Sequence, residues 1–438
     1  MRIESVLEHV RATPVLSPVG RITATQGPLL IATGLDAKLG DGAWLLGDRG
    51  QRLCLAEVVG FRDEHVMLSP FGELDGISPE SRVELTGGPV NGPIGPGLLG
   101  RVVNALGEPL DSGSPLTNVR RLSLGAPPRS TQEHLPIETH LETGVRAIDA
   151  FVPVGEGQRM GIFAGSGVGK TTLLTMLAEG TTSTVTVLVL VGERGREVHD
   201  LLDATEGSRG HTVVIVTNSD EPPIRRLQAM RYGARIAESF RERGESVLLL
   251  VDSLTRVAFA QREIGLAAGE PPATRGYPPS VFGLLPRITE RAGRNSVGSI
   301  TAIFTILVEG DDLDDPVADH ARALLDGHIV LDRKLAERAH FPAINVLASN
   351  SRVATRVTTS AEQEATVAIR RAMGRYAEVE DLVRIGAYRK GNDAETDVAI
   401  AIQPAIEGFL QQRSDEPSSL AQTRAALAAL LRSGKGRP

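Results

Sequence analysis

One glycine-rich stretch, from Gly161 to Leu174, constrains this chain more than any other. It reads GIFAGSGVGKTTLL, in which a short apolar run precedes a loop with Gly165, Gly167 and Gly169. Because glycine has no side chain, successive backbone N–H groups of such a loop can turn inward and surround phosphate oxygens. The spacing therefore predicts a strand, a phosphate-binding loop and a helix whose N-terminus faces the anion.

The side chains that follow the loop supply groups that a nucleoside triphosphate needs. Lys170 offers a mobile positive charge to the β- and γ-phosphates, and Thr171 offers a hydroxyl to Mg²⁺. Ala164 departs from the strict pattern G-x-x-x-x-G-K-[ST], which has glycine there, but it is also small. A glycine-rich surface turn is the alternative, and the order of apolar run, loop and helical repeat disfavours it. The predicted nucleotide-binding residues of this stretch are Ala164, Gly165, Ser166, Gly167, Val168, Gly169, Lys170, Thr171 and Thr172.

The chain around this loop divides into three predicted domains. Residues 1–90 begin with apolar residues at helical spacing and continue as short apolar runs between Gly, Asp and Pro, which predicts an amphipathic helix and a small β-barrel. A Gly- and Pro-rich linker, 87–96, ends this region. Residues 91–353 alternate apolar runs with helical segments, and residues 354–438 are predicted to form a C-terminal helical domain with a frayed tail from Arg432. The expected fold class is an α/β P-loop core with a mainly parallel sheet, an N-terminal β-barrel and a C-terminal helical domain.

The parallel sheet and the C-terminal helices each leave specific signals. Continuous β-branched and Leu runs are typical of strands buried on both faces. The predicted strands are Val185–Val191, Val213–Val216, Val247–Val251 and Ile300–Val308. Capping-box spacing marks two helix starts in the C-terminal domain. The predicted boxes are Ser360 with Gln363 and Ser419 with Gln422.

Composition excludes several classes of protein. A single cysteine, Cys54, rules out an internal disulfide framework and fits a reducing compartment. No run approaches the roughly 18 apolar residues of a membrane span, and the N-terminus lacks a signal-peptide core, so we expect a cytoplasmic protein. A net charge of -7 and 3% aromatic residues argue against a nucleic-acid-binding surface.

Hydrolysis of a phosphoanhydride also needs a metal-directed carboxylate, a group that orients water, and positive charge for the transition state. Asp252 ends the apolar run that begins at Val247, so it is predicted at the sheet edge where P-loop folds present a carboxylate to the metal. The segment Gly192–Glu197 places two carboxylates and two guanidinium groups at the same edge. Taken alone, that segment is typical of a solvated charged loop.

Several of these motifs together carry a family resemblance that covers roughly residues 95 to 410. The segments that resemble the catalytic subunits of rotary ATP synthases and their relatives are Gly192–Glu197, Asp252–Arg256 and Pro342–Arg352. Three others look like the flagellar protein-export ATPase, whose nearest competitor is the type III secretion ATPase. These are Glu309–His320, Leu325–Asp332 and Asp381–Tyr388.

The resemblance implies roles for residues that their spacing alone leaves ambiguous. It makes Glu193 the carboxylate that polarises the attacking water and places Arg194 near the γ-phosphate. Arg352 matches an arginine finger that reaches into the site of the adjacent subunit. Phe341 matches the aromatic residue that stacks on adenine, with a buried core Phe as the alternative. Asn345 stands where the family more often has Asp, which weakens none of these assignments.

The function that follows from the resemblance is Mg²⁺-dependent ATP hydrolysis by a ring, expected as a hexamer, that energises flagellar protein export. The implied partners are export chaperones and cargo, a negative regulator, a central stalk protein and the export gate, with peripheral association at the inner face of the membrane. Alternatives within the class are a virulence-type secretion ATPase, a rotary synthase subunit and an RNA-dependent ring helicase. The different-class alternative is a non-catalytic nucleotide-binding module, which the presence of both Lys170 and Glu193 disfavours.

Overall fold

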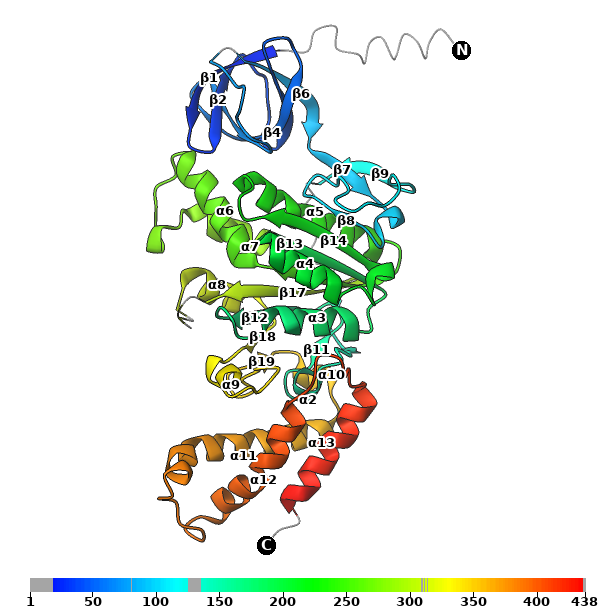
Figure 1. The fold of residues 1–438 in the computed structure, drawn as a ribbon, viewed down its shortest axis with the longest axis vertical. Helices are drawn as coiled ribbons and strands as arrows, with labels where there is room; N and C mark the ends of the chain where they lie inside the picture. Colours follow the sequence, from blue (N-terminus) through cyan, green and yellow to red (C-terminus); the bar gives the residue numbers. More distant parts are fainter. Residues whose placement is uncertain are drawn as a thin grey trace.

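The computed structural model describes residues 19–79, 81–124, 135–308, 310, 312 and 314–435. The amphipathic helix predicted over the first dozen residues lies outside this described part. Three layers follow one another along the long axis: a β-barrel at one end, an α/β region in the middle and a set of helices at the other end (Figure 1). The expected fold class is confirmed.

The barrel consists of six antiparallel strands, closed in the order β1-β2-β5-β4-β3-β6. Their bounds are Val19–Gln26 (β1), Leu29–Thr33 (β2), Asp41–Leu46 (β3), Arg52–Arg62 (β4), His65–Pro70 (β5) and Arg82–Pro89 (β6). Leu30, Leu45 and Leu68 are fully buried in its interior, on the inward-facing side of their strands. The barrel is joined to the middle layer through Glu57, whose two carboxylate oxygens accept hydrogen bonds from Arg231 at 2.7 and 2.9 Å.

The Gly- and Pro-rich linker is more ordered than its composition predicts. Strand β6 extends to Pro89, and residues Asn91–Ile94 form β7, which pairs with β9, Arg120–Ser123. A Cβ atom at Gly92 would lie 3.3 Å from the ring of Tyr232, whose hydroxyl donates to the Pro93 carbonyl at 2.6 Å. A side chain at Gly92 would press on Leu124 and Tyr232, so this stretch packs against the middle layer as well as connecting the barrel to it.

The middle layer is a nine-stranded sheet in the order β19-β18-β12-β17-β15-β13-β14-β8, with β16 paired to β17. Its strands are Val102–Val103 (β8), Arg159–Ala164 (β12), Val185–Glu193 (β13), Thr212–Asn218 (β14), Ser246–Asp252 (β15), Gly293–Arg294 (β16), Ser299–Leu307 (β17), Gly327–Val330 (β18) and Asn350–Ser351 (β19). Only β16 and β19 pair antiparallel, and the other pairs are parallel. The four predicted strands are confirmed.

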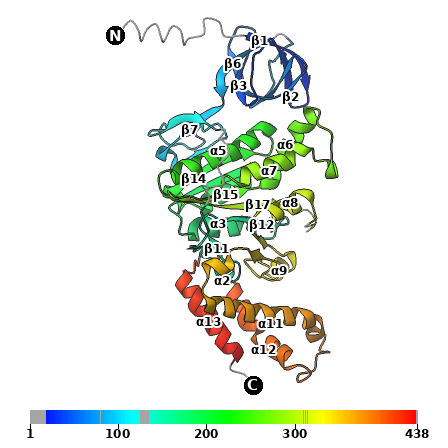
Figure 2. The ribbon, with the colours of Figure 1, turned by 180° about the vertical axis from the view of Figure 1, so that it is seen from behind.

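Alternate residues of the central strands enter different cores, which explains their continuous apolar runs. Val187 and Val189 of β13 pack with the helices that lie toward the barrel, whereas Leu188 and Leu190 pack with those toward the C-terminal helices (Figures 1 and 2). The first group is Pro223–Arg241 (α5), Leu254–Ala267 (α6), Pro279–Thr289 (α7) and Pro316–Leu324 (α8). The second is Arg146–Phe151 (α2), Lys170–Gly180 (α3) and Gly195–Ala204 (α4), with the short Arg333–Glu337 (α9) nearby.

The C-terminal region is helical, as predicted, but one helix start differs by one residue. The helices are Ala354–Val357 (α10), Ser360–Arg384 (α11), Ala394–Leu410 (α12) and Leu420–Lys435 (α13). The box proposed for Ser360 and Gln363 is wrong, because Thr359 caps α11 and its N–H donates to the Glu362 carboxylate at 2.7 Å. The helix dipole favours a negatively charged carboxylate in the first helical turn, whereas it gives no such advantage to a neutral amide. The Ser419–Gln422 box is confirmed.

None of the helices in the described ranges is long and apolar enough to cross a membrane.

Candidate nucleotide site

The glycine-rich stretch forms the predicted strand, loop and helix. Strand β12 ends at Ala164, α3 begins at Lys170, and the loop between them turns through Gly167 and Gly169, with φ of 78° and 93°. A side chain at either glycine would be strained, so their positions are required by the backbone. Ala164 is buried in the β12–β17 ladder opposite Leu307, without a positive φ, so the departure from the strict pattern costs the loop nothing.

Three charged groups from separate elements meet beside the loop. The Lys170 ammonium contacts a carboxylate oxygen of Asp252, at the end of β15, and lies 3.5 Å from Oε1 of Glu193, at the end of β13. Both carboxylates are only 3% exposed. The Thr305 hydroxyl donates to Asp252 Oδ1 at 2.6 Å and so orients it. Ser253 caps helix α6, which leaves the Asp252 side chain available to the site.

Glu193 reaches this position through an irregularity in its strand. The β13–β14 register shifts between Val191 and Glu193, and Gly192 has a φ of 66°. Such a bulge re-aims the next side chain, here toward Lys170. Arg256 secures the arrangement: it donates to the Gly192 carbonyl, and its NH2 lies 3.3 Å from Glu193 Oε2.

Sequence reasoning did not single out Arg256 as a functional residue. It lies on α6, four residues after Asp252. One turn of helix after a carboxylate at the sheet edge is a place from which a side chain can return to the same site. This spacing was the available signal, but the bulge that brings Glu193 within reach of Arg256 is not visible in the sequence.

Burial makes the Glu193 carboxyl an unusually weak acid. Removal from water raises the pKa of its carboxyl to about 7, and the nearby Asp252 adds to this, whereas the Lys170 and Arg256 charges oppose it. Among the described residues, Glu193 Oε1 has no hydrogen-bond partner. A buried carboxylate with a pKa near neutrality, and with an oxygen that forms a 3.5 Å ion pair with Lys170 but no hydrogen bond, is suited to accept a hydrogen bond from water and, in turn, a proton.

The loop and Glu193 line a cleft of about 1090 Å³. Arg194, exposed at the start of α4, lines it together with the phosphate loop. Arg333 also lines it and donates to the Ser166 carbonyl at 3.2 Å, a contact that sequence reasoning missed. The cleft therefore presents Lys170, Arg194 and Arg333 to an anion, as a polyphosphate site requires.

A second pocket of about 500 Å³ adjoins the end of the loop at Gly169 and the start of α3. Its walls come from Gly169, Thr172, Leu173 and Met176, from Phe341 and Pro342, and from the segment 411–416 between α12 and α13. Phe341 is 42% exposed, so the interpretation as a buried core residue is wrong. The Gln412 N–H donates to the Phe341 carbonyl at 3.0 Å and ties the C-terminal helices to this wall. An exposed aromatic face beside a phosphate loop fits a planar base.

Arg352 is the one predicted catalytic residue that lies away from the 1090 Å³ cleft lined by Lys170, Glu193 and Arg194. It follows β19, the edge strand of the sheet, and its side chain is exposed, with NH2 donating to the Arg322 carbonyl at 3.3 Å. The structure thus brings Lys170, Glu193 and Asp252 together within one chain and leaves Arg352 at the periphery.

The oxygen donors beside the loop fit a magnesium ion held jointly with phosphate. Mg²⁺ prefers oxygen ligands and retains several waters, and protein carboxylates seldom supply its whole shell. Thr171 and Asp252 provide a hydroxyl and a carboxylate next to the loop. No group of three or more His, Cys, Asp or Glu side chains that could hold a metal ion occurs among the described residues. Phosphate oxygens and waters would complete the shell.

Comparison with known proteins places this geometry in a family. The ATP synthase alpha/beta family matches twice, with its beta-barrel domain over residues 22–87 and its nucleotide-binding domain over residues 144–351. The C-terminal domain of the type III secretion ATPase EscN matches residues 358–429. The three matches follow the three layers of the fold.

Whole-chain relatives agree with the domain matches. The chain is 44% identical to a flagellum-specific ATP synthase of Bacillus subtilis, over 98% of this chain and 99% of the relative. It is 46% identical to a type 3 secretion system ATPase of Xanthomonas euvesicatoria, over 96% of each. The structure of assembled EscN from enteropathogenic E. coli superposes with a TM-score of 0.89 at 40% identity, covering 94% of this chain and 100% of that one. The chain therefore belongs to the family of flagellum-specific and type III secretion ATPases.

Proposed function

We propose that this protein is a Mg²⁺-dependent ATPase that energises export of flagellar proteins through a type III export apparatus. The observation that carries the proposal is the buried cluster of Lys170, Asp252 and Glu193 beside a phosphate loop. A non-catalytic nucleotide-binding module has no need to bury at this point a carboxylate that has a raised pKa and an oxygen without a hydrogen bond. Family membership supports ATP as the nucleotide.

The residues divide the chemistry among themselves. Backbone N–H groups of the loop and the Lys170 ammonium bind the phosphates, and the Phe341 ring stacks on adenine. Thr171 and Asp252 hold Mg²⁺, which neutralises phosphate charge when bound. Glu193, held by Arg256, accepts a hydrogen bond from the attacking water and orients it, and Arg194 adds positive charge near the γ-phosphate.

Arg352 completes the site of a neighbouring subunit in this proposal. Its place at the sheet edge, outside its own cleft, supports a role in trans. A contact between different surfaces of identical chains closes into a ring, and a hexamer is proposed here. The solved EscN structures are described as an assembled ATPase and as a complex with its central stalk EscO. For this chain we propose an equivalent stalk partner, together with chaperones, cargo, a negative regulator and the export gate, at the cytoplasmic face of the membrane.

A virulence-type secretion ATPase is the second candidate. Both pathways supply relatives of nearly equal identity, so the nucleotide site does not separate them. The test is genetic replacement: this chain should restore swimming motility and filament export to a flagellar ATPase deletion strain, with a Lys170→Ala chain as the inactive control. Restored secretion of virulence proteins without motility would favour the second candidate.

Removal of divalent metal should abolish hydrolysis and leave part of the nucleotide binding. With excess EDTA, ATP turnover is expected to fall to background because the phosphate charge is no longer neutralised. A fluorescent ATP analogue should still bind, through Lys170 and the loop, with affinity weakened by about tenfold. A phosphate-release assay measures the turnover, and fluorescence anisotropy measures binding of the analogue. Readdition of Mg²⁺ is the control. Undiminished turnover in EDTA would contradict the metal assignment.

Hydrolysis should fall in acid as Glu193 takes up a proton. Because the pKa of its carboxyl is raised to about 7, kcat/KM should rise with pH through neutrality and level off above it. The Arg256→Gln variant removes a charge that lowers this pKa, so its acid limb should move to higher pH. Protonation of the nucleotide also affects the profile, but the substitution cannot move it. Identical acid limbs in the two proteins would contradict the assignment to Glu193.

A further inference from the structure

Asp326, in the turn before β18, connects the phosphate-loop strand to the residue proposed to act on the neighbouring site. Its N–H donates to the Arg159 carbonyl at 2.8 Å, and its own carbonyl accepts from the Arg352 N–H at 2.9 Å. Arg159 is the first residue of β12, the strand that ends in the phosphate loop. One residue therefore spans the three strands β12, β18 and β19 at this end of the sheet.

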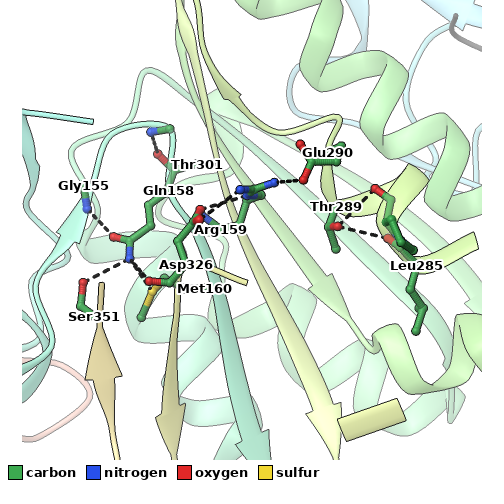
Figure 3. Close-up of polar contacts among 12 residues, drawn as sticks. Gly155, Gln158, Arg159, Met160, Leu285, Thr289, Glu290, Thr301, Asp326 and Ser351 are labelled. Carbon is green, nitrogen blue, oxygen red and sulfur yellow. Dashed lines mark hydrogen bonds and ion pairs between the residues drawn. The ribbon is translucent and has the colours of Figure 1, made fainter. Parts of the chain in front are cut away.

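The Asp326 side chain reinforces the same connection. Its carboxylate accepts from Arg159 at Nε (2.9 Å), NH2 (3.0 Å) and the backbone N–H (3.1 Å), while the remaining arm of the guanidinium contacts Glu290 at the end of α7 (Figure 3). The two side chains of this fork are only 20% and 22% exposed. A forked ion pair that is largely shielded from water fixes geometry as well as adding energy.

A second buried side chain holds the residue before Arg352. Gln158, fully buried, donates from Nε2 to Ser351 Oγ and to the Asp326 carbonyl, each at 3.1 Å (Figure 3). The Ser351 hydroxyl in turn donates to the Pro153 carbonyl at 2.7 Å. The backbone at 351–352 is thus held at both residues, whereas the Arg352 side chain beyond it is exposed.

We propose that Asp326 and Arg159 are positioning residues that aim Arg352 into the adjacent subunit's nucleotide site. The inference rests on the proposed trans role of Arg352. A guanidinium that must meet transition-state charge across a subunit boundary tolerates little displacement, because misplacement by about 1 Å can cost on the order of 100-fold in rate. The exposed side chain has few contacts of its own to set its direction, so the direction is set by the anchored backbone at its base.

The test uses a variant that keeps the shape of the side chain. Asp326→Asn removes the charge of the fork, and ATP hydrolysis by the assembled protein is expected to fall about tenfold in kcat, with KM changed less than about twofold. Arg159→Lys, which replaces the planar fork by a single ammonium, should act in the same direction. Glu290→Gln is the matched control, because it breaks the exposed arm of the same arginine and leaves the Asp326 fork intact. A control loss equal to that of Asp326→Asn would overturn the proposal.

Mixed assemblies separate positioning in trans from damage to the subunit's own site. Asp326→Asn subunits keep a working phosphate loop, and Lys170→Ala subunits keep a correctly placed Arg352. Mixing them should restore near-wild-type turnover at each Asp326→Asn site that adjoins a Lys170→Ala subunit. Failure to recover, in a mixture where Arg352→Ala with Lys170→Ala does recover, would overturn this inference alone. Failure of both mixtures would overturn the trans role of Arg352 and this inference with it.

Discussion

Glu193→Gln is expected to lower kcat for ATP hydrolysis by about 10²- to 10⁴-fold, the range typical for loss of a positioned general base. The amide keeps the size of the side chain and its place at the end of β13, but it cannot carry the negative charge that polarises water. Nucleotide affinity should stay within about threefold, because the loop and Lys170 supply the phosphate contacts. Phosphate release and equilibrium binding of an ATP analogue measure the two quantities.

The matched control for this substitution is Glu206→Gln. Glu206 undergoes the same chemical change in an exposed turn after α4 and makes no contact with Lys170. Its turnover should equal that of the wild type. If Glu193→Gln also hydrolysed ATP at the wild-type rate, Glu193 would not be the water-polarising carboxylate, and its burial would have to serve the fold alone.

Arg352→Ala should lower kcat by about 10³-fold or more in the assembled protein, because an arginine finger neutralises charge that develops only in the transition state. ATP binding should persist, since Arg352 lies outside the cleft of its own chain. Arg356→Ala, which removes an exposed arginine one turn further along, is the control expected to retain activity.

Mixing gives the sharper form of this prediction. In equal mixtures of Arg352→Ala and Lys170→Ala, half of the sites have a working loop and half of the neighbours have a working finger. Random closed rings should therefore recover about one quarter of the wild-type rate. A recovered ATPase rate that increases with protein concentration would show that the recovery requires assembly of the subunits. A mixture as inactive as its two components, although ring formation is normal by light scattering, would rule out action in trans.

Sequence patterns predicted the loop and the strands well because both depend on short-range constraints. Glycine at positions with positive φ, such as Gly167 and Gly169, reflects the local backbone, and a run such as Val185–Val191 reflects burial on both faces of one strand. The patterns were less reliable where a residue had two uses. Gly92 resembled a linker glycine but is a contact point for Tyr232.

The site needed information that no single segment carries. Glu193 and Asp252 end the adjacent strands β13 and β15, and Lys170 follows the loop after β12. They meet because these strands are parallel, so their carboxyl ends lie at the same edge of the sheet. The raised pKa of the Glu193 carboxyl depends on how deeply that strand end is buried. Arg256 joins the site only because Gly192 turns the strand toward it.

By itself, the sequence determined that the chain binds a nucleotide phosphate, contains a parallel sheet behind a barrel and ends in helices, since glycine spacing and apolar periodicity are local properties of the backbone. Only the tertiary structure decided which charged residues share the cleft and that Arg352 stands apart from it. It also showed that Asp326 joins Arg352 to the phosphate-loop strand. These relations depend on strand order and on burial, which arise when segments distant in the chain pack together and exclude water.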